Sequence, residues 1–508
     1  MNKIEGKLKF WRARMLNMAG RRMIINHCII PMVIYFLSCW RPPEDDLNFF
    51  TALCRNILWG GDPWTKKMAK VKWEYCCIPK EDGGLGIIDI RELADRLAAK
   101  WILRGILHPQ HKWAWLLNRN NHLFHIKGLS KWTGLPFSTI VASKFEISPK
   151  GSDLVVSMWK AWLRIKGQIV LSPNTRDLAG LHRQDSIWWP ALAIPQVEVP
   201  DMEEAIKMHK MGIKLWENIW DDESNSWFSR GNLIAKFNLS NRQLDVIGRR
   251  IMRWDPGEWW LMSLKTSPKI AALQWKKQTV LWPIPPHHSI RSIHKDLNKR
   301  WSLLRDRKQW KYLFSELWGK YVEPKKACLT WLVMYRAIWT QKKAKHLLGK
   351  GDGKCRRCGL EEDDIHIFLQ CKAIAPWIAS INRYVVSSGR GGLSWKQLLI
   401  GDSIGCSLEL WTVIRTEILW FLWIERLYAI FQGTTRNSCS LQQCLINAGE
   451  RYYSRKHSFL TSRIQTLQKR LNLKPRKQSY IVALEEYHER LESLVKTDFS
   501  YVLKLQYL

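Results

Sequence analysis

The strongest constraint on this chain is the stretch KCRRCGLEEDDIHIFLQC, which spaces three cysteines and one histidine as Cys-x2-Cys-x7-His-x4-Cys. Cys355 and Cys358 are followed by Gly359, so one tight turn can direct both thiols at the same ion. His366 and Cys371 can then complete a tetrahedral Cys3His shell. Four protein ligands leave no coordination position open for water, so the spacing predicts a structural zinc ion that contributes folding free energy.

The same residues allow a second interpretation, in which the three thiols and the histidine are simply buried in a core. The sequence favours the metal because the Cys pair, the histidine and the last cysteine fall within one polar loop. The acidic run Glu361-Glu362-Asp363-Asp364 offers oxygen ligands. Beside three cysteines, however, it is more typical of a solvated turn or a helix N-terminus.

The charge of the chain indicates its partner. Lys and Arg number 80 against 45 Asp and Glu, which gives a formal net charge of +35 in 508 residues. Such an excess repels itself unless a polyanion neutralises it, so nucleic acid is the first partner to consider. The 12 cysteines are scattered rather than arranged as a disulfide framework, which indicates a reducing compartment, the nucleus or alternatively the cytoplasm.

Two basic segments supply the candidate nucleic-acid contacts, one near the N-terminus and one around the Cys/His motif. Each residue could contact phosphates through its charge or belong to an ordinary solvated face, and the sequence does not decide between these roles. The candidates are Lys3, Lys7, Arg14, Arg21, Arg22, Lys342, Lys343, Lys345, Lys354, Arg356 and Arg357.

Apolar periodicity predicts a mainly α-helical, multidomain protein. We expect three helices within residues 3–59, a short strand at 71–73, and a helix over 91–103 that Asp89 caps. The Gly-Gly-Leu-Gly run at 83–86 lacks the spacing of a phosphate loop and predicts tight turns. Residues 410–433 are apolar almost all round, which predicts a buried helix.

Neither a membrane span nor an active site is predicted. The most apolar run, residues 23–40, contains Asn26, His27 and Pro31, and falls short of the roughly 20 uninterrupted apolar residues of a span. Two-metal phosphoryl transfer needs converging carboxylates, but none of the three Asp pairs follows an apolar strand. GxSxG, HExxH and Walker motifs are missing as well. We therefore expect no membrane partner and no enzyme activity by this chain alone.

Several segments together resemble a known family. IEGKLKFWRARMLNMAGRRMIINHCIIPMVIYFLSCWRPPE, CRNILWGG and KVKWEYCCIPKEDGGLGIIDIRELADRLAAKW resemble the thumb and connection of plant-type LINE (non-LTR) retrotransposon reverse transcriptases. EPKKACLTWLVMYRAIWTQKKAKHLLGKGDGKCRRCGLEEDDIHIFLQCKAIAPW is similar to their zinc-binding domain, and ILWFLWIERLYAIFQG to the helix that follows. The polymerase palm with its aspartates would lie upstream of Met1, and neither an endonuclease nor an RNase H tetrad is found.

The resemblance implies four domains. They are a thumb-like helical bundle and connection at 1–106, a Trp-rich mixed connector at 107–282, a zinc-binding domain at 289–400, and a helical C-terminal region with a basic tail at 401–508. It implies a protein that grips RNA or an RNA–DNA duplex by backbone contacts, with a polymerase core supplied in trans. The alternative is a zinc-stapled structural or protein-interaction module that binds no nucleic acid.

Overall fold

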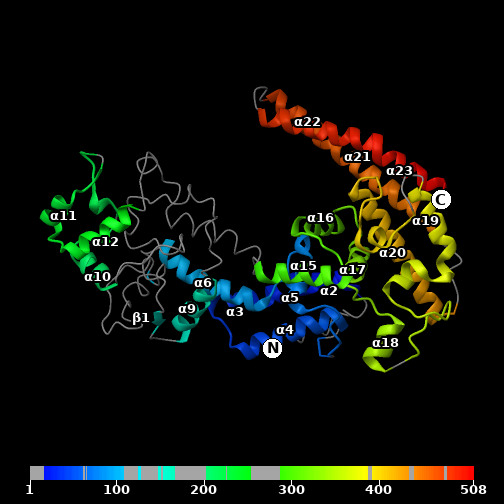
Figure 1. The fold of residues 1–508 in the computed structure, drawn as a ribbon, viewed down its shortest axis with the longest axis horizontal. Coiled ribbons are helices and arrows are strands. Elements are labelled where there is room, and N and C mark those ends of the chain that lie inside the picture. The colour runs from blue at the N-terminus through cyan, green and yellow to red at the C-terminus, as the bar shows by residue number, and fades with distance from the viewer. Residues whose placement is uncertain are drawn as a thin grey trace. The chain divides into compact units, whose positions relative to one another are not determined.

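A computed structural model describes residues 16–60, 63–64, 66–107, 112, 124–126, 147–149, 153–165, 202–214, 216–224, 226–252, 287–349, 351–386, 392–433, 440–473 and 478–507. These residues are mainly helical, which confirms the predicted fold class (Figure 1). Strands occur there only as two short antiparallel pairs. The chain forms two compact units, and each draws on segments far apart in the sequence. Unit 1 contains residues 1–26, 53–87 and 287–508, and unit 2 contains 27–52 and 88–286.

Unit 1 carries the Cys/His motif. Its α-helices are α2 (Met18–Ile24), α5 (Trp73–Cys77), α15 (His287–Trp301), α16 (Arg307–Leu317), α17 (Pro324–Met334), α18 (Gln341–Leu348), α19 (Ala375–Val386), α20 (Leu408–Phe431), α21 (Leu441–Leu473), α22 (Gln478–Ser493) and α23 (Phe499–Lys504). Shorter 3-10 and π turns are η3 (Lys80–Asp82), η7 (His366–Gln370), η8 (Lys372–Ile374), η9 (Lys396–Ile400), η10 (Leu494–Asp498) and η11 (Leu505–Tyr507).

The centre of unit 1 is α20, which is buried along most of its length as the sequence predicted. Helices α17 and α21 pack directly against it, so the buried helix links the zinc-motif region to the C-terminal helices. Helices α21 and α22 lie side by side along their length (Figure 1). The α20–α21 contact determines which face of α21 is left for solvent.

The glycine-rich run forms turns that dock on the zinc-motif region. The carbonyl oxygen of Gly83 accepts hydrogen bonds from Trp331 Nε1 and Tyr335 Oη, both at 2.8 Å. The neighbouring Asp82 is buried and pairs with Arg307 at 3.2 Å. These contacts confirm the prediction of tight turns, and they give the run a structural task in joining two distant segments of the sequence.

Unit 2 contains α3 (Ile30–Cys39), α6 (Ile90–Leu107), α9 (Asp153–Ile165), α10 (Met202–Lys210), α11 (Arg230–Phe237), α12 (Asn241–Met252) and the 3-10 turn η6 (Trp216–Ile219). Strands β1 (Phe124–Ile126) and β2 (Ile147–Pro149) pair in an antiparallel manner, as do β3 (Trp220–Asp221) and β4 (Ser226–Trp227). Helix α6 packs between α3 and α9, and its residue Asp95 binds Arg41 and Arg164. Two of the boundaries between the units fall within helix α4 (Glu44–Gly60) and within the π turn η2 (Ile25–Ile29).

The apolar N-terminal helix differs from the expectation. The continuous stretch Met18–Cys39 is long and apolar enough, by length and composition, to cross a membrane. An 18-residue part of it has a mean hydropathy of 1.5, and 39% of that part is buried. Its polar residue Asn26 is buried and donates to the carbonyl oxygen of Gly86 at 2.7 Å. The side chain that was expected to interrupt the helix is therefore satisfied within unit 1.

Of two further local predictions, the strand at 71–73 is wrong and the Asp89 cap is confirmed. Residues 71–73 do not form a strand, because Trp73 begins α5. Helix α6 begins at Ile90, and Asp89 Oδ1 accepts from Arg91 N at 2.8 Å, which confirms the cap. Residues 1–15 and most of 107–282 lie outside the described residues, and with them Lys3, Lys7, Arg14 and most of the Trp-rich segment.

Replacing Gly84 with Ala should destabilise unit 1 strongly. A Cβ at this position would lie 1.8 Å from the backbone oxygen of Ile78, which no rotamer change can relieve. We expect a loss of more than about 3 kcal/mol in the free energy of unfolding by chemical denaturation. Gly248→Ala is the control, because its Cβ meets nothing within 4 Å and a helix interior favours Ala by roughly 1 kcal/mol. Equal stabilities of the two variants would contradict the docked-turn structure.

Candidate metal centre

The structure brings the four predicted ligands together. The potential donor atoms of Cys355, Cys358, His366 and Cys371 all lie within 4.8 Å of one another. The Cys355 and Cys371 sulfurs are 3.8 Å apart, and Cys358 Sγ is 3.3 Å from His366 Nε2. Tetrahedral zinc with bonds of about 2.3 Å to sulfur and 2.0 Å to nitrogen requires separations of about 3.5–3.8 Å. The sulfur pair at 3.8 Å fits this range, and the sulfur–nitrogen pair at 3.3 Å is slightly shorter. The four donors therefore cluster closely enough for a Cys3His zinc shell.

The backbone explains how the loop aims these side chains. Cys355 N donates to Leu360 O at 2.7 Å, and Gly359 N donates to Cys355 O at 2.8 Å, which closes a tight turn around the first two cysteines. Gly359 has φ +78°, a left-handed conformation that glycine adopts without strain. His366 begins η7, and its backbone N donates to Asp363 Oδ1 at 2.7 Å. Cys371 follows at the end of the same turn.

The pKa shifts of the side chains in the cluster are compatible with metal binding. Burial raises the pKa of the Cys371 thiol to about 12, so this group needs a cation to become a thiolate. At Cys358 the effect of burial is outweighed by hydrogen bonds, including that of the Leu360 backbone, and the pKa is lowered. Burial lowers the pKa of His366, which favours the neutral imidazole that binds metals.

Arg357 supplies a further test of whether zinc fits. It is half-buried, and its Nε and Nη2 atoms are buried without a hydrogen-bond partner among the described residues. Its charge acts on both Cys371 and His366. Three thiolates and Zn²⁺ leave one net negative charge, which this guanidinium would balance. The donor set and the adjacent cation together fit a structural zinc ion.

The acidic run inside the motif ends at a helix N-terminus, which is one of the two expected roles, since Asp363 Oδ1 accepts from His366 N. Glu362 and Asp364 are buried instead of solvated, and they anchor the loop. Glu362 and Arg426 of α20 form a bidentate ion pair at 2.6 and 3.1 Å, with side chains only 1% and 4% exposed. Glu362 Oε1 also accepts from Gln341 N at 2.9 Å, at the start of α18. Asp364 is buried as well, and it binds Lys343 Nζ at 2.8 Å. Glu362 ties the motif to both α20 and α18, and Asp364 adds a second tie to α18.

The structure places the predicted basic residues in two groups. Lys343 is held inside by Asp364 and by the carbonyl oxygens of Arg336 and Ile338, at 2.7 and 3.0 Å. Lys342 pairs with Glu361 at 2.6 Å at the surface.

Three other predicted cations near the motif are more accessible to solvent than Lys343. Lys345, Lys354 and Arg356 are exposed and lie around the motif. On α2, burial lowers the pKa of both Arg21 and Arg22, and Arg21 Nη1 donates to Leu58 O at 3.4 Å.

Sequence reasoning missed the partners that hold the loop. Arg426 lies next to Glu425 in a largely apolar part of α20, and a cation in such a buried helix signals a carboxylate partner. This signal does not identify the partner residue, because Glu362 lies 64 residues away in the sequence.

Comparison with known proteins agrees with this geometry. Residues 296–377 match the family model described as zinc-binding in reverse transcriptase, and the match contains all four clustered residues. Over 443 residues the chain is 23% identical to an Arabidopsis thaliana protein named "Putative ribonuclease H protein". The alignment covers 86% of this chain and 64% of that protein, so the chain spans less than two thirds of this relative. Residues 296–377 are thus a zinc-binding domain of the reverse-transcriptase type, and both similarities point to a retroelement origin.

Changing Cys355 to Ser should abolish stoichiometric zinc binding. The hydroxyl is a poor zinc ligand, and the remaining three side chains cannot close the shell. Metal analysis of the purified protein should give about one zinc per chain for the unaltered sequence and far less for the variant. Cys39→Ser is the matched control, because Cys39 is exposed and lies outside the cluster. Full zinc retention by C355S would contradict the assignment.

Breaking the Glu362–Arg426 pair should cost more than breaking a surface pair. Glu362→Gln leaves the buried Arg426 charge without its counter-ion, and we expect a loss of about 3 kcal/mol in the free energy of unfolding of the zinc-loaded protein. Lys342→Gln breaks the neighbouring exposed pair with Glu361, and should change it by less than about 1 kcal/mol. Adding Arg426→Met to E362Q should recover part of the loss. Similar losses for both single variants would show that the buried pair anchors nothing.

Proposed function

We propose that this protein is a retroelement-derived nucleic-acid-binding protein of the LINE reverse-transcriptase type, which holds RNA or an RNA–DNA duplex through phosphate contacts. The observation that carries the proposal is the basic surface around the zinc cluster. Lys354 and Arg356 are exposed there, on a loop that the metal and the Glu362–Arg426 pair hold in place, and Lys345 is exposed on the neighbouring helix α18. Contacts from such side chains to the backbone give affinity without base recognition.

The zinc in this proposal has a structural task. Its four protein ligands would leave no open coordination position, so the ion orders the loop and supplies no reaction chemistry. The match to the zinc-binding domain of reverse transcriptases and the net charge of +35 support a polyanion as the partner. The polymerase core would act in trans, and the nucleus is the compartment in which such a protein meets its substrates.

A second candidate function is a zinc-stapled protein-interaction module. The internal pairing of Lys342 and Lys343 favours it, because these two cations already have carboxylate partners. The two functions differ in their salt dependence. Phosphate binding weakens steeply with salt, whereas an apolar protein interface persists.

We further propose that the chain carries no polymerase activity of its own. Its sequence offers no palm aspartates, and a closed zinc shell is not a catalytic centre. The name of the Arabidopsis relative makes RNA cleavage in an RNA–DNA duplex the reaction to assay beside template-dependent nucleotide incorporation. Incorporation or cleavage by the purified chain would overturn this part of the proposal.

The zinc-loaded chain should bind a labelled hairpin RNA and an RNA–DNA duplex with strong salt dependence. We expect the affinity to fall more than about tenfold between 50 and 200 mM salt, because several phosphate contacts release counterions. The variant C355S/C358S should bind more weakly at every salt concentration, because its basic loop is no longer ordered. Fluorescence anisotropy measures both effects, and circular dichroism verifies that each protein is folded. A folded protein that binds neither probe at moderate salt would favour the interaction module.

A further inference from the structure

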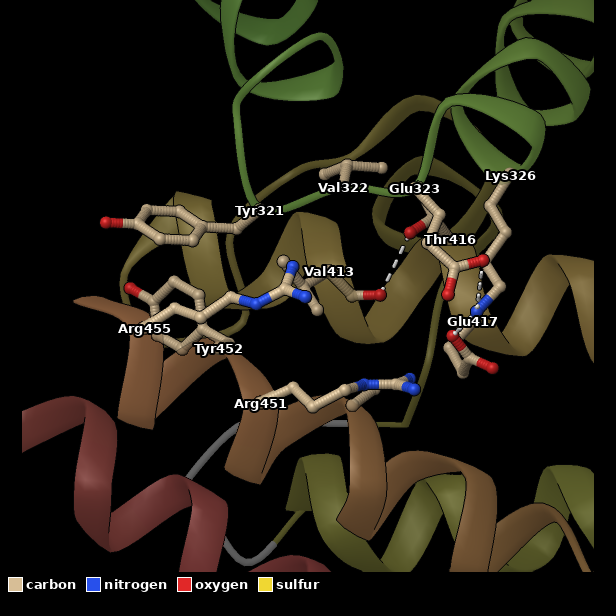
Figure 2. Close-up of a pocket in the computed structure, with 11 residues that line it drawn as sticks. Tyr321, Val322, Glu323, Lys326, Val413, Thr416, Glu417, Arg451, Tyr452 and Arg455 are labelled. Carbon is tan, nitrogen blue, oxygen red and sulfur yellow. Dashed lines mark hydrogen bonds and ion pairs between the residues drawn. The ribbon is translucent and has the colours of Figure 1, made fainter. Parts of the chain in front are cut away.

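A small pocket lies between three helices of unit 1, away from the zinc cluster. It has a volume of about 100 Å³ and is formed by the segment that begins α17, the middle of α20 and the first half of α21 (Figure 2). The lining residues are Tyr321, Val322, Glu323, Lys326, Val413, Thr416, Glu417, Ala448, Arg451, Tyr452 and Arg455. Two of its walls, α20 and α21, belong to the helical C-terminal region at 401–508.

Two arginines face this pocket without a partner. Arg451 and Arg455 are one helical turn apart on α21, and Figure 2 shows both side chains extending into the pocket. The Arg455 side chain passes the rings of Tyr321 and Tyr452. Neither guanidinium has an ion-pair or hydrogen-bond partner within the part of the chain that the structure describes.

The carboxylates of the pocket are already neutralised by another cation. Lys326 Nζ lies 3.2 Å from Glu323 Oε2 and also bonds to Glu417 Oε2. Lys326 and Glu417 are both buried, so this triad belongs to the wall of the pocket. With two carboxylates and three cations, the pocket keeps a positive charge that is located on Arg451 and Arg455.

The size of the pocket selects the kind of ligand. At about 100 Å³ it is well below the roughly 300 Å³ at which pockets for whole small molecules begin, so it admits a single group and not a nucleotide. Two guanidinium groups that line one small pocket suit a tetrahedral phosphate, whose oxygens accept paired N–H donors.

We propose that Arg451 and Arg455 form a phosphate-binding pocket that holds one phosphate of a nucleic-acid strand. The inference rests on the proposed function for the identity of its ligand. Further along α21, at the same four-residue spacing, Phe459 and Arg463 continue this face of the helix. Lys320 Nζ lies 3.1 Å from the Phe459 ring centre, and Arg463 lies 5.4 Å from it. These two cations would meet the neighbouring phosphates of the strand.

The test compares two pairs of substitutions that remove the same charge from the same helix. R451Q/R455Q removes the two arginines from the pocket and leaves Lys326 with its carboxylates, while K469Q/R470Q removes two exposed cations outside it. Binding of a labelled single-stranded RNA is measured by anisotropy over a salt series. We expect the pocket pair to weaken binding at least about tenfold and to reduce the salt slope by about 2, and the control pair to weaken it by less than about threefold. R451K/R455K should recover only part of the affinity, because Lys lacks the paired donors.

Inorganic phosphate distinguishes the pocket from the strand that fills it. Added at constant ionic strength in place of chloride, it should raise the melting temperature of the unaltered chain and leave that of R451Q/R455Q unchanged. Equal losses of RNA affinity in the two Gln pairs, or none in the pocket pair, would overturn the proposal while RNA binding itself stands. A phosphate-dependent shift in a chain that binds no RNA would keep the pocket but overturn its nucleic-acid ligand, and with it the proposed function. A chain that shows no phosphate-dependent shift and binds no RNA would overturn both the phosphate pocket and the proposed function.

Discussion

The zinc-motif region depends on one buried ion pair, Glu362 with Arg426. The motif loop is too short to build a hydrophobic core, so it needs a fixed attachment as well as a metal. The bidentate pair supplies that attachment by joining the loop to α20, which is buried along most of its length. Because both charges are desolvated, either one alone would be strongly unfavourable, and this makes the docking of the loop on α20 specific.

Charge is divided between two tasks in unit 1. The acidic residues of the motif are used internally, where Glu362 and Asp364 neutralise Arg426 and Lys343. Other cations are exposed, on the motif loop and on α21. A count of basic residues near the motif therefore does not tell which of them pair with a carboxylate of the chain itself.

Local sequence signals predicted much of the helical structure. Asp89 marks the start of α6, and the apolar stretch of α20 predicts its burial. The failures occur where distant contacts override local preference. The strand predicted at 71–73 is wrong, because Trp73 begins the short helix α5. The Tyr75 hydroxyl of this helix bonds to Ser292 Oγ at 3.1 Å, a contact that the local sequence does not reveal.

The sequence by itself determined the zinc site, because its four ligands lie close along the chain and their spacing is a local geometric requirement. It also determined the mainly helical fold, which follows from apolar periodicity, and its net charge of +35 is the reason that we propose a polyanion as partner. Tertiary structure alone decided that Glu362 meets Arg426, that the glycine turns dock on Trp331, and that α21 presents two arginines to one pocket. These contacts join residues far apart in the sequence, and only the packing of helices determines which side chains meet.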